Sequence, residues 1–529
     1  MRKILVANRG EIAVRVIRAC RDMGLASVAV YSACDRTARH VRMADEACAI
    51  GPNAPSESYL NIDRLLEAAR STGADAVHPG YGFLAENAQF AAACRDAGLT
   101  FIGPTPEAIA LMGSKTEARR AAIAASVPVV PGTEQPFAPG DPDDAIASAA
   151  ERIGYPLLVK AVAGGGGKGM RTVAKAADLP GAIRAARSEA GTAFGDAAIY
   201  LERELTRPRH IEVQLLGDHH GRVVPFVERE CSIQRRHQKV IEETPSPVVT
   251  PAFRAYLTDA AAAVARAVGY TGAGTIEFLV DEDNRCWFLE MNTRLQVEHP
   301  ITEMVTGIDL VEWQIRIARG EKLDLDPVLA NTPDGHAIEC RIYAEDPDMG
   351  FIPSPGRIAV LRAAGGPWVR NDGGAESAGE VPIYYDPLIS KLSAWGPDRP
   401  HAIARMSRAL REYEVLGIRT TVPFFRWLLA QPAFLAAAFH TGYLDELLHQ
   451  TTGRGGETFA TADKDEEEAA VIGAVLHLMA DLRKSAPDAR YSEAVASPRP
   501  SRRPAGWKDL ARAEALRPGR RSLQGEGGP

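Results

Sequence analysis

One stretch sets the interpretation of the whole chain: Glu290-Met291-Asn292-Thr293-Arg294-Leu295-Gln296-Val297-Glu298-His299-Pro300. It follows an apolar run, residues 286–289, of the kind that ends a buried strand. Carboxylates, amides, an arginine and a histidine thus fall at a strand end and loop, where catalytic side chains commonly lie on a rigid scaffold. A solvated loop would have a similar composition, but residues of these kinds recur at several other places in the chain. We therefore interpret the stretch as part of a functional site.

A predicted hairpin just before this stretch brings two carboxylates together. Two apolar segments, residues 275–280 and 286–290, flank the turn-forming residues 281–284. The midpoint between Glu277 and Glu290 falls inside that turn, so the two side chains pair across the strands on one face. Opposed like charges destabilise a sheet unless a cation lies between them. Carboxylate oxygens completed by water and phosphate suit magnesium rather than zinc.

A glycine-rich segment after another predicted strand indicates phosphate binding. Residues 163–170 read Ala-Gly-Gly-Gly-Gly-Lys-Gly-Met, and four consecutive glycines leave backbone N–H groups open to phosphate oxygens. The segment is not a Walker A loop, because no GxxxxGK[ST] motif can be placed. Lys160 before the glycines and Lys168 within the segment favour phosphate binding over a merely flexible loop. Such a loop is suited to open and close as a lid.

Three other segments leave alternatives open. Residues 78–87 (HPGYGFLAEN) are explained by a tight strand-to-helix connection or by a functional role. Residues 228–239 are dense in hydrogen-bond donors, as either a basic surface face or an anion-binding segment would be. Asn8-Arg9-Gly10 resembles a nucleotide-binding turn only loosely, because no GxGxxG motif is present.

Length and composition bound the class of protein. The chain has 529 residues, enough for about three or four domains, and 46% of them are hydrophobic, a globular value. The net charge of −7 argues against a general nucleic-acid binder. Seven cysteines without a CxxC pair indicate a reducing compartment. Because no signal peptide or membrane span is recognisable, we expect a soluble, cytoplasmic protein.

Periodicity predicts the remaining architecture. Alternating strand and helix patterns over the first hundred or so residues indicate a parallel sheet covered on both faces. Strict alternation over residues 210–216 predicts a strand with His210, Glu212 and Gln214 on one face. A helix is expected from Pro300 to about Gly320, and a strand over residues 337–344 places Glu339, Arg341 and Tyr343 on one face. After a polar linker, residues 451–461, an amphipathic helix over residues 465–483 and a disordered tail are predicted.

Together these features form a site that would use ATP to activate a small acid. At this point the sequence closely resembles the biotin carboxylase family, the ATP-grasp component of biotin-dependent carboxylases. The resemblance covers about residues 1–449 and rests on four motifs: residues 78–87, 164–167, 228–239 and 290–300. It implies an α/β and α+β multidomain fold. The expected parts are a Rossmann-like N-terminal domain (1–113), an ATP-grasp domain (114–330) with a glycine-rich lid at about 131–205, a mixed C-terminal domain (331–449), and a helix with a disordered tail (450–529).

The resemblance also implies a reaction. ATP phosphorylates bicarbonate to carboxyphosphate, which breaks down to CO₂ and phosphate. The phosphate then takes the N1 proton of biotin, and the resulting enolate captures CO₂. The alternatives are a different ATP-grasp ligase, which joins a carboxylate to an amine through an acyl phosphate, and a nucleotide-binding regulatory protein without catalysis.

Each role implied by the resemblance falls on named residues. The ATP-binding set is Lys115, Lys160, Gly164, Gly165, Gly166, Gly167, Met170, Glu202, Leu205, His210, Gln234, His237 and Leu279. The bicarbonate and biotin set is Lys239, Arg294, Gln296, Val297, Glu298 and Arg341; of these Lys239, Arg294, Glu298 and Arg341 are the catalytic residues, with Glu298 as the base. Glu277, Glu290 and Asn292 would hold Mg²⁺ or Mn²⁺.

The expected protein partners depend on the biotin-attachment motif, which this sequence does not contain. None of the 10 methionines is followed by lysine, the dipeptide that carries biotin in full-length carboxylases of this type. We therefore expect biotin on a separate carrier protein and carboxyltransferase subunits from other chains, in an acetyl-, propionyl- or methylcrotonyl-CoA carboxylase, with this chain as a homodimer. Trp313 resembles the propionyl- and methylcrotonyl-CoA types more than the acetyl type. The helix after residue 449 could dock a partner or be a remnant.

Overall fold

The computed structural model describes residues 1–162, 170–452, 459 and 473. The chain divides into two compact units, Met1–Thr461 and Ala462–Pro529, and Gly473 is the one described residue of the second. Three predictions fall outside the described residues: the lid glycines Gly164–Gly167, the helix over residues 465–483 apart from Gly473, and the tail. They stay predictions.

The N-terminal part contains the predicted parallel sheet. Its strand order is β3-β2-β1-β4-β5, and every pairing is parallel. Alternate residues of β1 enter different cores, since Ile4 and Val6 pack with α1 while Leu5 packs with α3 and α4. Helices therefore cover both faces. The elements are β1 (Lys3–Val6), α1 (Gly10–Asp22), β2 (Ala26–Ser32), α2 (Arg39–Met43), β3 (Glu46–Gly51), α3 (Ile62–Thr72), β4 (Ala76–His78), α4 (Ala88–Asp96), β5 (Thr100–Phe101) and α5 (Pro106–Gly113).

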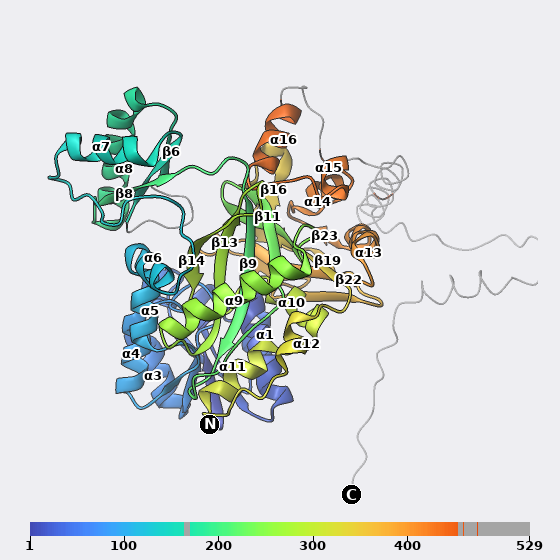
Figure 1. The fold of residues 1–529 in the computed structure, drawn as a ribbon. Helices are drawn as coiled ribbons and strands as arrows, with labels where there is room; N and C mark the ends of the chain where they lie inside the picture. The colour runs from blue at the N-terminus through green and yellow to red at the C-terminus, as the bar shows by residue number, and fades with distance from the viewer. Residues whose placement is uncertain (163–169, 453–458, 460–472, 474–529) are drawn as a thin grey trace, which may run out of the picture. The chain divides into compact units, whose positions relative to one another are not determined.

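The segment predicted as a lid has a sheet and a core of its own (Figure 1). The antiparallel order is β7-β6-β8, and Val159 and Leu201 pack against Ile146 of a helix on one side. The elements are α7 (Asp143–Ile153), β6 (Leu157–Ala161), β7 (Met170–Val173), α8 (Leu179–Phe194) and β8 (Ile199–Arg203).

A single antiparallel sheet of nine strands among the described residues forms the centre of the molecule. Its order is β14-β13-β9-β11-β12-β15-β22-β20, with β10 paired to β9. It crosses residue 330, so the predicted ATP-grasp and C-terminal domains share one sheet. Its strands are β9 (Arg209–Gly217), β10 (Val223–Pro225), β11 (Arg229–Arg235), β12 (Gln238–Thr244), β13 (Gly272–Val280), β14 (Cys286–Asn292), β15 (His336–Tyr343), β20 (Val369–Gly373) and β22 (Leu388–Gly396).

The two faces of this sheet differ in chemistry. Along β9, Ile211 and Val213 pack into an apolar core with α9 (Pro251–Ala267), which lies across the sheet in Figure 1. The alternate residues His210, Glu212 and Gln214 are buried on the other face, as their spacing predicted. One face is therefore a core and the other carries the polar groups described below.

One helix prediction was wrong. The single helix expected from Pro300 to about Gly320 is two helices, α10 (His299–Thr306) and α11 (Leu310–Ala318). Gly307 ends the first in the left-handed region (φ +69°), and Asp309 caps the second by accepting the Glu312 N–H at 2.7 Å. The predicted linker at 451–461 is also too long, because α16 includes Thr452.

The remaining elements complete the C-terminal part and its connections. Three short strand pairs lie outside the main sheet: β16 (Glu345–Asp346) with β17 (Ile352–Pro353), β18 (Gly356–Arg357) with β21 (Glu380–Val381), and β19 (Val360–Arg362) with β23 (Glu414–Leu416). The other helices are α6 (Lys115–Ala124), α12 (Pro327–Asn331), α13 (Arg399–Glu412), α14 (Val422–Leu428), α15 (Pro432–Leu435) and α16 (Tyr443–Thr452).

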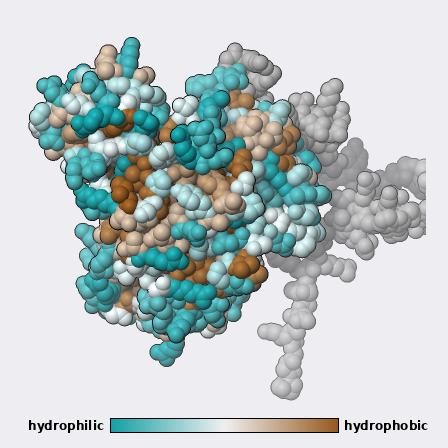
Figure 2. Space-filling model, in the orientation of Figure 1, coloured by the Kyte–Doolittle hydropathy of each residue, from teal (hydrophilic) through white to brown (hydrophobic). Residues whose placement is uncertain are grey.

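Hydrophilic residues cover most of the face shown in Figure 2, with apolar residues in scattered patches. No helix among the described residues is both long and apolar enough to cross a membrane.

We predict that Phe278→Ala lowers the free energy of unfolding by about 3–5 kcal/mol, the usual cost of emptying an aromatic site in a core. Phe278 lies in β13, is fully buried, and packs against the α9 core. Urea unfolding followed by circular dichroism measures the change. Ile383→Ala is the control, since Ile383 is 74% exposed and should change stability little. Equal losses in the two variants would contradict this account of the core.

Candidate active site

One cavity of about 660 Å³ collects the predicted site residues. The lid strands, β9, the β11–β12 hairpin, the β13–β14 hairpin and β15 all contribute to its wall. Of the predicted residues that the structure describes, all but Glu298 line it: Lys115, Lys160, Met170, Glu202, Leu205, His210, Gln234, His237, Lys239, Glu277, Leu279, Glu290, Asn292, Arg294, Gln296, Val297 and Arg341. Glu298 is fully buried, in contact with Lys239 and Arg341.

The β13–β14 hairpin pairs the two predicted carboxylates, although the register shifts between Glu277 and Phe278, where a simple hairpin was expected. Glu277 lies opposite Glu290, and Asp281 holds the turn by accepting the backbone N–H groups of Asp283 and Arg285, each at 3.0 Å. Asn292, two residues after Glu290, donates from Nδ2 to Glu277 Oε1 at 2.9 Å. The two carboxylates therefore share one face, as the spacing predicted, and the Asn292 amide, which the family resemblance implied, lies with them.

The two opposed carboxylates differ in charge balance. Burial alone would raise the pKa of Glu277, but Lys239 and His210 lower it below its usual range. The pKa of Glu290 is raised, first by burial and then by Glu277. Glu290 is thus a half-buried acid beside Glu277, whose negative charge is already neutralised by Lys239 and His210. A divalent cation next to Glu290 would restore the balance with oxygen ligands of the kind that magnesium prefers.

Lys239 contacts three acidic residues at once. Its Nζ lies 2.5 Å from Glu212 Oε2, 2.8 Å from Glu277 Oε1 and 2.8 Å from Glu298 Oε1. Although burial would lower the pKa of Lys239, Glu212 and the other two carboxylates raise it well above its usual value. The ammonium group therefore stays charged and holds β9, β13 and the loop before α10 to β12.

The alternative that residues 228–239 form a basic surface face is wrong for residues 228–234, which are buried, whereas Arg236, His237 and Gln238 are exposed. Arg229 is fully buried and donates to Glu212 at 2.5 Å and to Thr302 at 2.9 Å. Sequence reasoning placed Glu212 on the polar face but assigned it no role. Its contacts with both cations make it a central residue of the cluster.

Glu298 is held ionised by its surroundings. Burial would raise its pKa, but Lys239, Arg341 and Arg229 keep that pKa well below the usual range. Arg341 donates from Nη2 to Glu298 Oε2 at 3.0 Å, so each carboxylate oxygen has a cationic partner. In this arrangement Glu298 can accept a proton only when a competing anion weakens those contacts.

Arg294 is oriented by a residue that sequence reasoning missed. Glu86 accepts the Arg294 Nε–H at 2.8 Å and the Thr293 backbone N–H at 3.0 Å. Arg294 also donates from Nη1 to Gln296 Oε1 and from Nη2 to Asn292 Oδ1, each at 2.9 Å. Residues 78–87 are therefore both a tight connection and part of the site, and the carboxylate within that motif was the signal that could have identified Glu86.

At the lid end of the cavity, a carboxylate is paired with two cationic side chains. Glu202 accepts from Arg119 Nη1 at 2.6 Å and from Lys160 Nζ. Its side chain is thus occupied, which leaves the backbone as the part able to meet a nucleotide base. Gln234 Nε2 lies 3.0 Å from His210 Nδ1. Burial, with Lys160 nearby, lowers the pKa of Lys115, while Glu290 opposes that shift.

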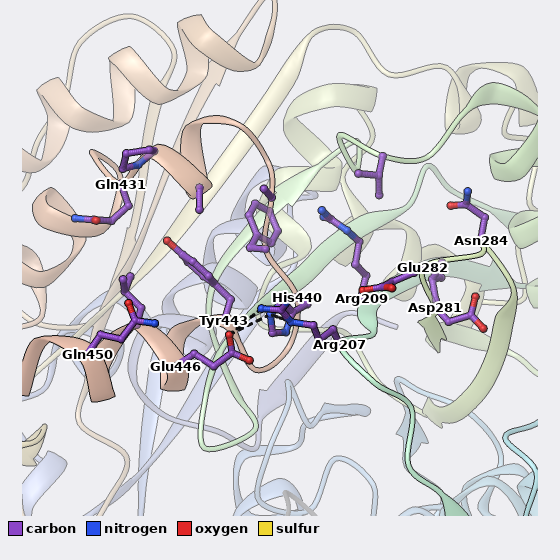
Figure 3. A pocket seen from close by; sticks show the side chains of 17 residues that line it. Arg207, Arg209, Asp281, Glu282, Asn284, Gln431, His440, Tyr443, Glu446 and Gln450 are labelled. Atoms are coloured by element: carbon purple, nitrogen blue, oxygen red, sulfur yellow. Dashed lines mark hydrogen bonds and ion pairs between the residues drawn. The ribbon is translucent and has the colours of Figure 1, made fainter. Parts of the chain in front are cut away.

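A second cavity, of about 900 Å³, lies beside the first and is shown in Figure 3. No predicted site residue lines it. Arg207 donates to His440 Nε2 at 3.0 Å and to Glu446 Oε2 at 3.1 Å, as the dashed lines in Figure 3 show. The backbone N–H of Thr441, the residue after His440, donates to the backbone oxygen of Pro208 at 2.9 Å. These contacts tie α16 to the segment that links the lid to β9.

Known families account for most of the chain. Residues 1–109 match the family described as "Biotin carboxylase, N-terminal domain", and residues 339–446 match "Biotin carboxylase C-terminal domain". Residues 114–326 match "Carbamoyl-phosphate synthase L chain, ATP binding domain".

Individual relatives agree. The chain is 52% identical over 447 residues to a biotin carboxylase of Nostoc sp., covering 84% of this chain and 99% of the relative. It is 52% identical over 444 residues to a pyruvate carboxylase subunit of Methanothermobacter thermautotrophicus, covering 84% and 89%. The structure of the biotin carboxylase domain dimer of Hydrogenobacter thermophilus 2-oxoglutarate carboxylase, in complex with MgADP, ADP and bicarbonate, superposes with a TM-score of 0.81 at 46% identity, covering 85% and 98%.

The predicted fold class, with its ATP-grasp centre, is confirmed by these matches. The non-catalytic alternative is set aside, because the relatives and the ATP-grasp match mark an ATP-dependent ligase. Sequence, fold and site geometry lead to one conclusion: the chain belongs to the biotin carboxylase family.

Proposed function

We propose that the protein carboxylates biotin borne on a separate carrier chain, as the first half-reaction of a cytoplasmic acyl-CoA carboxylase in which this chain is a homodimer. The observation that carries the proposal is the convergence of Lys239, Arg294, Glu298 and Arg341 beside the opposed carboxylates Glu277 and Glu290. The acceptor would be acetyl-, propionyl- or methylcrotonyl-CoA. Pyruvate is the second candidate acceptor, because one relative is named as part of a pyruvate carboxylase.

ATP would lie between the lid and β9. Lys115 and Lys160 are placed to neutralise phosphate oxygens, and Leu279 and Leu205 provide apolar wall for the base. His210 and Gln234, which contact each other, would order the nucleotide from the β9–β11 side. Glu277, Glu290 and Asn292 would hold Mg²⁺ or Mn²⁺, which when bound neutralises charge on the transferring phosphoryl group.

Bicarbonate would bind at Arg294. A planar guanidinium can hold a planar anion through two hydrogen bonds, and Glu86 already fixes its orientation. Gln296 and Val297 line the same wall. The incoming anion competes with Glu298 for Lys239 and Arg341, which raises the pKa of Glu298 toward that of a useful base. Glu298 then takes the bicarbonate proton while a bicarbonate oxygen bonds the γ-phosphorus and the bond to ADP breaks.

Carboxyphosphate formed beside Arg294 would break down to CO₂ and phosphate in the same part of the cavity. The phosphate takes the N1 proton of biotin, and the enolate attacks CO₂ to form carboxybiotin. Arg341, at the border of the cavity, and Arg294 would stabilise the negative charge of the phosphate and then of the enolate. Both arginines are held by carboxylates and need little rearrangement to do so.

ATP hydrolysis by the purified chain should depend on bicarbonate and be accelerated by free biotin. A coupled assay for ADP, run with each component omitted in turn, measures this. If biotin has no effect, the carboxylation of biotin by this chain is contradicted, and a ligase that couples a carboxylate to an amine becomes the better account.

Glu298→Gln should lower the bicarbonate-dependent rate by about 10²–10⁴-fold, as expected for loss of a general base, while ATP still binds.

Glu290→Gln should raise the Mg²⁺ concentration needed for half-maximal activity by at least about tenfold, since even loss of an outer-shell partner weakens metal binding that much. Titration of ATPase activity with Mg²⁺ measures the shift. Glu282→Gln is the matched control, because Glu282 is exposed in the turn of the same hairpin. An unchanged Mg²⁺ requirement in Glu290→Gln would contradict the assignment of the opposed carboxylates.

A further inference from the structure

A second pair of carboxylates lies opposed in the central sheet. Glu242 of β12 is in register with Glu339 of β15, and both side chains are fully buried. Neither lines the cavity of about 660 Å³, so neither would touch substrate directly. Directly opposed like charges in a sheet are unfavourable unless a cation or a proton compensates them. Such an arrangement inside a core therefore needs an explanation.

The compensating cation is Arg341. Its Nη2 lies 2.6 Å from Glu242 Oε1 and 3.0 Å from Glu298 Oε2. The guanidinium is thus held between a carboxylate deep in the sheet and the proposed base at the cavity. Arg341 follows Glu339 by two positions on β15, so its direction is also set by the strand.

Glu339 has a different set of contacts. Ser393 Oγ donates to Glu339 Oε2 at 2.8 Å, and Ser393 is the in-register neighbour of Glu339 on β22. No hydrogen bond or ion pair between Glu339 and Arg341 is among those the structure describes. The two members of the pair are therefore distinguishable: one contacts the arginine and the other contacts a hydroxyl.

We propose that Glu242 is a positioning residue for biotin carboxylation, holding the Arg341 guanidinium where it can serve the reacting anion and release Glu298. The proposal rests on the function proposed above and assigns a role to a residue that does not contact substrate. Without the Glu242 charge, Arg341 loses one of these two acidic contacts and keeps the other, with Glu298. The two groups would then neutralise each other more tightly and be less available for chemistry.

The pKa shifts of the two carboxyl groups fit this division. Burial and then Glu242 raise the pKa of Glu339 well above its usual value, although Lys391 opposes that rise. Burial, opposed by Arg341 and increased by Glu298, raises the pKa of Glu242 to about 7. The titratable and charged groups that act on Glu242 are Arg341, Glu339, Cys340 and Tyr343 from β15, Glu298 from the loop before α10, Cys231 from β11 and Lys239 from its own strand.

The sign of the pH effect follows. Because the Glu242 pKa is raised, its charge is present above about pH 7 and is lost as the pH falls through that value. The proposal therefore requires the activity of the wild-type chain to decline on the acid side near neutrality, and it requires Glu242 to be the cause.

The test compares Glu242→Gln with Glu339→Gln in the full chain. Both replace a buried carboxyl by an amide of the same shape, but only the first removes an acidic contact of Arg341. Glu242→Gln should lower kcat of the ATPase activity that requires bicarbonate and biotin by about 10- to 100-fold, a usual cost of losing a supporting contact. The KM for ATP should be unchanged, and the acid limb near neutrality should disappear. Glu339→Gln should keep both kcat and the acid limb.

Glu242→Asp provides a second variant that retains a charge at the same place. It should show an intermediate kcat and keep the acid limb, which a purely structural role would not predict. The proposal is overturned if Glu242→Gln keeps the wild-type kcat and pH profile, or if Glu339→Gln lowers kcat equally. It is also overturned if Glu242→Gln loses ATP affinity in parallel with kcat. A wild-type chain that shows no dependence on bicarbonate and biotin would instead overturn the proposed function.

Discussion

A single buried ammonium group holds the active site together. Lys239 bonds Glu212 on β9, Glu277 on β13 and Glu298 before α10, while Arg229 neutralises Glu212 from behind. Removing one partner of a buried ion pair typically costs about 3–5 kcal/mol, and Lys239 is the partner of three. Lys239 therefore holds both Glu277, in the hairpin proposed to bind metal, and Glu298, the proposed base. The arrangement also explains why Glu298, buried as it is, stays ionised.

Continuity of the central sheet brings the C-terminal part into this cluster. Pairing of β12 with β15 places Arg341 and Glu242 beside Lys239 and Glu298, across the expected domain boundary at residue 330. The opposed carboxylate pairs of this sheet include Glu277 with Glu290 and Glu242 with Glu339. The first has the oxygen chemistry for a metal ion, and in the second Glu242 contacts an arginine, Arg341. The boundaries at residues 113, 330 and 449 stay predictions, as do the homodimer and the carrier.

Sequence patterns within a single strand or hairpin predicted the features that depend on residues close together in the chain. Glu277 lies opposite Glu290 as predicted, and alternation along β9 placed His210, Glu212 and Gln214 on one face. The turn alone would pair Glu277 with Leu289, since Val280 pairs with Cys286, and a register shift between Glu277 and Phe278 brings Glu290 opposite instead. Contacts between distant segments could not be predicted in this way. Glu86 and Arg294 are 208 residues apart, and nothing in their own neighbourhoods specifies their pairing. The role of Glu242 depends on sheet order, and the helix break at Gly307 depends on a backbone angle that a hydrophobic pattern does not encode.

The most direct test of the central claim follows the oxygen atoms of bicarbonate. If Arg294 and Glu298 direct bicarbonate to attack the γ-phosphorus of ATP, turnover with oxygen-18-labelled bicarbonate and free biotin should transfer one labelled oxygen into each phosphate released. Mass spectrometry of the phosphate measures the transfer, with samples taken before label exchanges into water. Phosphate that carries one solvent oxygen and no labelled oxygen would show that water attacks ATP directly, and would contradict the assignment of this cluster to bicarbonate activation.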